Sequence, residues 1–201
     1  MHCPYCQQSV AEESAQCAAC GLDLARLDGV LGIAPVLQAG LTDVAGVLIP
    51  AAARQIRRSL SQFRERFPQI QLALLVQEAP TVVPLTTWAW WLFNRSRFSL
   101  ALDKGFVNRD ILLVVDPVKR QAALTIGYGL EPFVGKRDLS DALAAGQSAL
   151  AAGDWAETCG RILVALDDGL RQILDRMSRA YGVPLPLLAP PEEASEPANH
   201  W

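Results

Sequence analysis

Apolar side chains recur every three or four positions between residues 50 and 67, with arginines filling many of the positions between them. The apolar set is Ala53, Ile56, Leu60, Phe63 and Phe67. This spacing places the set on one face of an α-helix. Pro50 suits the first helical turn and Pro68 cannot continue the helix, so the pattern predicts an amphipathic helix between the two prolines.

Three further segments are apolar runs of strand length. Residues 70–77 follow the proline that ends the helix, and residues 111–116 stop at Pro117. The third run is residues 121–126, and residues 117–120 suit a tight connection between the last two runs. We therefore predict one buried strand and, later in the chain, a β-hairpin.

Three other segments have helical character. Residues 85–94 are rich in aromatic side chains, and a second segment runs from about Ser140 to Ala152. A longer helix opens at Asp154, where Glu157 completes a capping-box pattern. The order helix, strand, helix, two strands, two helices predicts an α/β fold, with a central sheet flanked by helices.

Composition excludes some classes of protein. Apolar residues make up 51% of the 201 residues, which argues against disorder. The formal net charge of −3 provides no long-range attraction to nucleic acid or anionic lipid. We identify no secretory signal after Met1 and no uninterrupted apolar run of the roughly 20 residues that cross a bilayer, so the sequence predicts a cytoplasmic protein.

The chain divides into four predicted regions. Residues 1–22 form a cysteine module, residues 23–40 a connector of uncertain structure, and residues 41–181 the α/β domain. Residues 182–201 are rich in proline and glutamate and cannot bury a core, so we predict a flexible tail. We expect the connector to separate the cysteine module from the α/β domain, so that the two unfold independently.

The cysteine module contains two C-x₂-C pairs separated by ten residues: Cys3, Cys6, Cys17 and Cys20. Two such turns facing each other present the tetrahedral thiolate set that zinc favours. The module has few apolar residues, so metal binding would supply its folding energy. Gly21 provides the backbone freedom that such a turn needs. We predict a structural zinc ribbon that docks a protein partner.

Other uses of these cysteines stay open, namely a redox dithiol pair or bound iron. A catalytic zinc is disfavoured, because four cysteine ligands leave no open coordination position. His2 is interpreted as a bystander and Cys159 as a small core residue. The module resembles the short N-terminal zinc ribbons common on bacterial proteins, although these often have glycine where this chain has Gln7.

The most specific motif of the α/β domain lies in residues 108–131, where an apolar strand, a short basic turn and a second strand lead into Gly-Tyr-Gly-Leu-Glu. This stretch resembles the centre of the TPM domain family. Residues 41–48 resemble the opening segment of that family, and residues 152–155 resemble the Gly-Asp-aromatic step before its final helix. The resemblance covers about residues 41–176.

The resemblance implies a TPM-like sandwich of a central sheet and flanking helices, which agrees with the pattern of elements. It also implies a range of functions. Some members of the family are phosphatases of modest activity, some bind calcium or other divalent ions, and others act in the assembly or repair of membrane complexes.

Four carboxylates are candidates for a divalent-ion site: Asp43, Asp110, Glu131 and Asp138. They could converge at the ends of the strands, where open α/β sheets bind ligands, and their oxygens suit calcium or magnesium. The alternative is that they are solvated loop carboxylates and helix caps.

Two glycines, Gly127 and Gly129, could bring the backbone close to an anion, but we favour a structural turn as their role. We predict that Gly129 adopts a backbone conformation closed to residues with a Cβ. The aromatic segment 85–94 is interpreted as core packing, with a ligand platform as the alternative. The arginines of the first helix form either a solvated face or a phosphate-binding one.

Two functional hypotheses follow. In the first, the protein is an interaction, regulatory or assembly module whose zinc ribbon docks a partner. In the second, it is a divalent-metal-assisted phosphatase that uses the carboxylates near the Gly-Tyr-Gly turn. No catalytic residue is assigned, since the only histidines, His2 and His200, lie near the ends of the chain. We favour the first hypothesis.

Overall fold

A four-stranded sheet forms the centre of the computed structural model, which describes residues 2–11, 14–37, 40–96 and 108–181. The strands lie in the order β1 (Gly40–Asp43), β2 (Leu72–Val76), β3 (Ile111–Asp116) and β4 (Gln121–Ile126). β1, β2 and β3 are parallel, whereas β4 runs antiparallel to β3. The predicted hairpin is therefore confirmed. The predicted tail lies outside the described residues.

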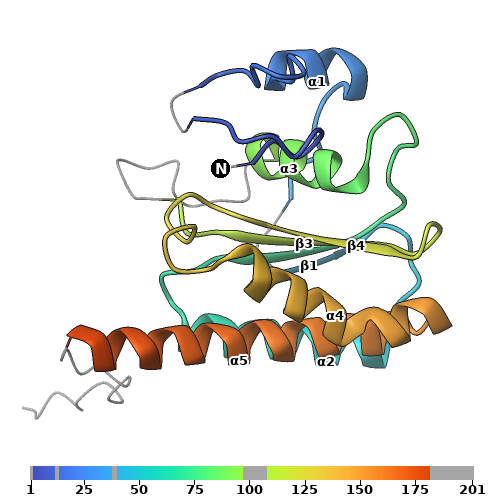
Figure 1. The fold of residues 1–201 in the computed structure, drawn as a ribbon. Helices are drawn as coiled ribbons and strands as arrows, with labels where there is room; N and C mark the ends of the chain where they lie inside the picture. The colour runs from blue at the N-terminus through green and yellow to red at the C-terminus, as the bar shows by residue number, and fades with distance from the viewer. Residues whose placement is uncertain (1, 12–13, 38–39, 97–107, 182–201) are drawn as a thin grey trace, which may run out of the picture.

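Helices cover both faces of this sheet (Figure 1). The helices are α1 (Leu24–Leu31), α2 (Pro50–Arg66), α3 (Leu85–Arg95), α4 (Lys136–Ala152) and α5 (Trp155–Tyr181). α2, α4 and α5 lie on one face, and α3 lies on the other, with α1 and the cysteine module outside it. The predicted fold class, a central sheet flanked by helices, is confirmed.

Every residue of β2 and β3 is buried. Leu74 and Leu113 point into the core beneath α2 and α5, whereas Leu75 and Leu112 point into the core beneath α3. A strand covered on both faces must be apolar at every position, which explains why these segments are continuous apolar runs. Full burial of each such leucine contributes about 1.5–3 kcal/mol.

Two elements were missed by the pattern and one begins earlier than expected. β1 is a short, partly polar strand that exists through its parallel pairing with β2. α1 lies within the predicted connector, where Asp23 caps it by accepting a hydrogen bond from the N–H of Arg26 at 2.6 Å. α4 begins at Lys136 rather than near Ser140. Asp154 caps α5, as predicted, by accepting from the N–H of Glu157.

Candidate functional site

The four cysteines of the module converge, and all their Sγ atoms lie within 4.8 Å of one another. The Sγ atoms of Cys3 and Cys20 are 3.7 Å apart, as are those of Cys6 and Cys17. A zinc ion with four Zn–S bonds of about 2.3 Å would separate its ligands by about 3.8 Å. These separations are far too long for disulfides, which join sulfurs about 2.05 Å apart. The geometry therefore fits a single metal ion held by four cysteines.

The two turns that carry the cysteines have the same backbone geometry. The N–H of Gln7 donates to the carbonyl of Cys3, and the N–H of Gly21 donates to the carbonyl of Cys17, at 3.0 and 2.8 Å. Both Gln7 and Gly21 have left-handed backbones, with φ of 62° and 70°. Gly21 has the role expected of it, whereas Gln7 adopts a conformation that costs a non-glycine residue about 1 kcal/mol.

The electrostatic environment of the thiols also suits a cation. The backbone N–H of Cys20 lowers the pKa of Cys17 to about 7. At Cys20 the backbone N–H of Leu22 lowers the pKa, but burial and the neighbouring thiols outweigh it and raise the pKa to about 12. Four thiolates crowded together repel one another, so a bound cation would stabilise the set.

The cysteine module is docked on α3. The hydroxyls of Thr86 and Thr87 both donate to the carbonyl oxygen of Pro4 at 3.1 Å, and Thr87 is fully buried. The expected separation of the module from the α/β domain is therefore wrong. These contacts join residues more than eighty positions apart, so they cannot be predicted from a local sequence pattern.

α1 is fastened to the same helix through Asp28. Its carboxylate accepts from the indole N–H of Trp91 at 2.8 Å and forms an ion pair with Arg95 at 2.6 Å. The hydrogen bonds from Arg95 and then from Trp91 lower the pKa of Asp28. The predicted connector is therefore part of the packed structure.

A groove of ≈ 440 Å³ lies between the cysteine module, α3 and β4; we refer to it as the β4 groove. Pro4 and Gln7 line it from the module, Trp90 from α3, and Leu124 and Ile126 from β4. Both interpretations of the aromatic segment 85–94, core packing and a ligand platform, therefore apply to part of it. Trp88 and Trp91 belong to the core, whereas Trp90 faces the groove.

The structure does not bring the four candidate carboxylates together. Asp43 ends β1 and accepts from the N–H groups of Gly46 and Leu48 at 2.9 and 3.0 Å. Asp110 directly precedes β3, which is parallel to β1 and β2. It therefore lies at the amino-terminal ends of the strands, whereas Asp43 lies at their carboxyl-terminal ends. Six residues of strand span about 17 Å. No ion can contact both.

The other two candidates have local roles. Glu131 is exposed in the turn after β4, and Asp138 accepts from the N–H of Gly135 at 2.7 Å at the start of α4. Among the described residues, the group of metal-ligating side chains close enough to share an ion is the cysteine set. These carboxylates therefore do not assemble the predicted calcium or magnesium site, because the parallel strands place Asp43 and Asp110 at opposite ends of the sheet.

The Gly-Tyr-Gly segment is a turn that closes against the start of β3. The N–H of Gly129 donates to the carbonyl of Asn108 at 2.8 Å. The prediction for Gly129 is wrong: it is not among the described glycines with positive φ. Gly127 is the constrained position, since an added Cβ would lie within 3.0 Å of the side-chain and backbone oxygens of Asn108.

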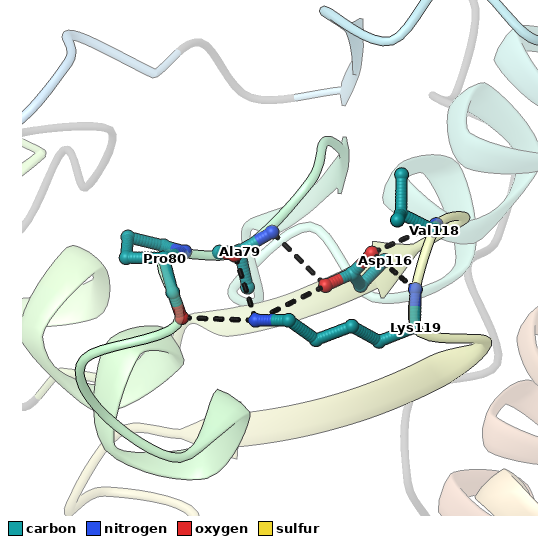
Figure 2. Close-up of polar contacts among 5 residues, drawn as sticks. All are labelled: Ala79, Pro80, Asp116, Val118 and Lys119. Carbon is teal, nitrogen blue, oxygen red and sulfur yellow. Dashed lines mark hydrogen bonds and ion pairs between the residues drawn. The ribbon is translucent and has the colours of Figure 1, made fainter.

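Sequence reasoning missed a buried aspartate and its partly exposed lysine partner at the end of β3, shown in Figure 2. Asp116 is fully buried, and its carboxylate accepts from the N–H groups of Ala79, Val118 and Lys119 at 2.9–3.0 Å. The Lys119 ammonium donates to the carbonyls of Ala79 and Pro80 at 2.8 and 3.0 Å. An aspartate followed by proline at a strand end is a turn signal that could have identified Asp116.

Comparison with known proteins identifies the α/β domain. The model of the TPM domain family matches residues 41–169. The solution structure of the N-terminal domain of a P. gingivalis protein is similar, with a TM-score of 0.56 and 23% identity over 67% of this chain and 83% of that one. The BA42 protein of the psychrophilic bacterium Bizionia argentinensis has a TM-score of 0.54 and 11% identity over 65% and 86% of the two chains.

The N-terminal domain of the cg2496 protein of Corynebacterium glutamicum is also similar, with a TM-score of 0.51 and 18% identity over 65% of this chain and 79% of that one. At these identities the likeness shows the fold. No curated protein matches the chain. Within the described residues, no helix combines the length and apolarity needed to span a membrane.

Proposed function

This chain belongs to the TPM domain family, and we propose that it is an interaction module in which a zinc-held ribbon and the TPM domain together bind an extended segment of a partner polypeptide. The observation that carries the proposal is the β4 groove, whose walls come from both parts. A groove built in this way is complete only while the cysteine module is folded and docked on α3.

The chemistry of the cysteine set supports zinc in a structural role. Four thiolates suit zinc better than calcium or magnesium, which prefer oxygen ligands. With four protein ligands, zinc has no open position for a water molecule or a substrate. The ion would then serve to hold one wall of the groove in place.

The position of β4 supports an extended ligand. Within the described part of the chain, β4 is an edge strand that pairs with β3 alone. An edge strand presents backbone N–H and C=O groups that an added strand can bind. Trp90 from α3 lies beside this edge, together with Leu124 and Ile126, and supplies apolar contacts for alternate side chains of such a peptide.

A displayed library of random peptides, selected on the full-length, zinc-loaded protein, tests the proposal. We expect the selected peptides to bind in solution and to slow hydrogen exchange of the β4 amides. Trp90→Ala should weaken binding about tenfold or more, as expected for an aromatic anchor. Thr125→Arg should also weaken it by placing a charge in the groove.

Val164→Ala, an exposed position on α5, serves as the matched control and should leave binding unchanged. Peptides that bind equally well to the Trp90 and Thr125 variants, or to protein stripped of zinc, would overturn the proposal. A selection that yields no binding peptide would do the same.

The phosphatase alternative requires carboxylates that gather around a divalent ion, and the four candidates lie apart. We expect the purified protein not to hydrolyse p-nitrophenyl phosphate when magnesium or calcium is added. Metal-dependent turnover that copurifies with the protein and is lost in Asp43→Asn would favour the alternative.

A further inference from the structure

The ammonium group of Lys119 lies at the end of the sheet where the parallel strands terminate, beside oxygen atoms of three residues (Figure 2). Its Nζ donates to the carbonyls of Ala79 and Pro80, and the carboxylate oxygen Oδ2 of Asp116 is 4.0 Å away. Two carbonyls and a carboxylate are the oxygen ligands that hard cations such as calcium prefer. Open α/β sheets also bind their ligands at this edge.

We propose that the Lys119 ammonium takes the place of a metal cation here, so that the TPM domain of this chain is closed to divalent ions at the carboxyl edge of its sheet. The divalent ion that resemblance to the family implies therefore does not fit this chain. The oxygen set is satisfied from within, and a dication brought to it would meet a positive charge already in position.

The turn between β3 and β4 positions the Lys119 ammonium beside Asp116. The side chain of Asp116 holds the turn by accepting from the N–H groups of Val118 and Lys119, and Arg120 follows with a left-handed φ of 52°. In this turn the Lys119 side chain reaches back across the end of the strand to the residues after β2. Because Asp116 is fully buried, its charge needs a nearby cation, and the hairpin provides one.

The acidic residue that ends β1, Asp43, does not create a second cation site. Both carboxylate oxygens of Asp43 accept backbone N–H groups of the loop that follows β1. Within the described residues, no group of three acidic side chains at this edge lies close enough to share an ion. The Lys119 ammonium is thus the cation paired with Asp116, and it joins the β3–β4 hairpin to the segment that leads into α3.

Thermal unfolding of the full-length, zinc-loaded protein with and without 10 mM calcium chloride tests the inference. For the wild type we expect no shift in Tm. Lys119→Ala should lower Tm by about 5–10 °C, because it leaves a buried carboxylate without its cation. Calcium should then recover about half of that loss, since an ion that binds only the folded state stabilises it.

Lys119→Met, which keeps most of the length of the side chain without the charge, should show the same gain of calcium dependence. Propylammonium chloride should partly restore Lys119→Ala, and sodium chloride at equal ionic strength should not. Lys136→Ala, at an exposed lysine that begins α4, is the matched control and should behave as the wild type.

A calcium-induced rise in the Tm of the wild type would overturn the inference. So would Lys119→Ala and Lys119→Met variants that fold but respond to neither calcium nor propylammonium. If both variants fail to fold, calorimetric titration of calcium into the wild type decides the matter: heat of binding that Asp116→Asn or Lys119→Arg abolishes would contradict a closed site.

Discussion

The cysteine module and the sheet are ordered by different forces. Among the described residues of the module, 2–11 and 14–22, the buried side chains are Cys3 and Cys17, both of them candidate metal ligands. In β2 and β3, by contrast, every side chain is buried between two helical layers. We infer that the module depends on a bound ion and on docking, whereas the sheet depends on apolar burial.

The two regions also differ in where their positive charge comes from. The module gathers four thiols close enough to share a metal ion, which would come from outside the chain. The carboxyl edge of the sheet has a buried carboxylate, Asp116, and the chain supplies its own cation, Lys119. Both arrangements hold α3: the module binds its first turn, and Lys119 binds the residues that lead into it.

The largest expected effect comes from removing one ligand of the module. Cys17→Ser should reduce bound zinc from about one ion per chain to well below one, because three thiolates bind zinc far more weakly than four. It should also lower the stability of the whole domain by about 2 kcal/mol, since the two hydroxyl bonds to Pro4 are lost with the module. Elemental analysis and denaturant unfolding measure the two effects.

Cys159→Ala is the control for this experiment, because Cys159 lies fully buried in the core and far from the module in sequence. It should retain zinc. An unchanged unfolding free energy in Cys17→Ser would show that docking on α3 contributes nothing to stability and that the two regions are independent after all.

The sheet should be broken by added volume instead of by loss of a ligand. Gly127→Ala forces a Cβ against Asn108, and we expect a loss of about 1–3 kcal/mol in unfolding free energy with bound zinc unchanged. Gly160→Ala, in α5 with open space around it, should stabilise by up to about 1 kcal/mol. Equal stabilities of the two variants would contradict the close approach at Gly127.

The smallest expected effect concerns the two turns of the cysteine module, at Gln7 and at Gly21. Gln7→Gly should relieve the left-handed backbone at this turn and stabilise the module by about 1 kcal/mol, whereas Gly21→Gln should destabilise it by a similar amount. The rate at which a chelator removes zinc provides the measurement: slower for the first variant, faster for the second. Identical rates would mean that backbone strain in the turns does not affect metal retention.

Patterns within short stretches of sequence were sufficient for most elements. The spacing of apolar residues located α2, and the continuous apolar runs located β2 and β3, because burial on both faces leaves no other composition for these strands. The paired cysteines were found in the same way, since each C-x₂-C turn is local. β1 and α1 escaped because each is stabilised by contacts with distant residues.

The candidate carboxylates show where such reasoning stops. Asp43 and Asp110 each lie at a strand end, but the sequence does not say at which edge of the sheet each end lies. Parallel pairing of β1, β2 and β3 places the two at opposite edges. Asp116 lies at the same end of the strands as Asp43 and was overlooked, because Ala79, whose N–H donates to it, and Pro80, whose carbonyl accepts from Lys119, belong to another connection.

By itself, the sequence determined the set of four paired cysteines, the core strands buried on both faces and the resemblance to the TPM domain family, because each depends on residues near one another in the chain. The tertiary structure alone decided that the module is docked on α3, that the β4 groove has walls from both parts, and that Lys119 meets Asp116 across two connections. These features arise when burial of the core brings distant segments together, and the spacing of residues within a short segment does not predict which distant segments will meet.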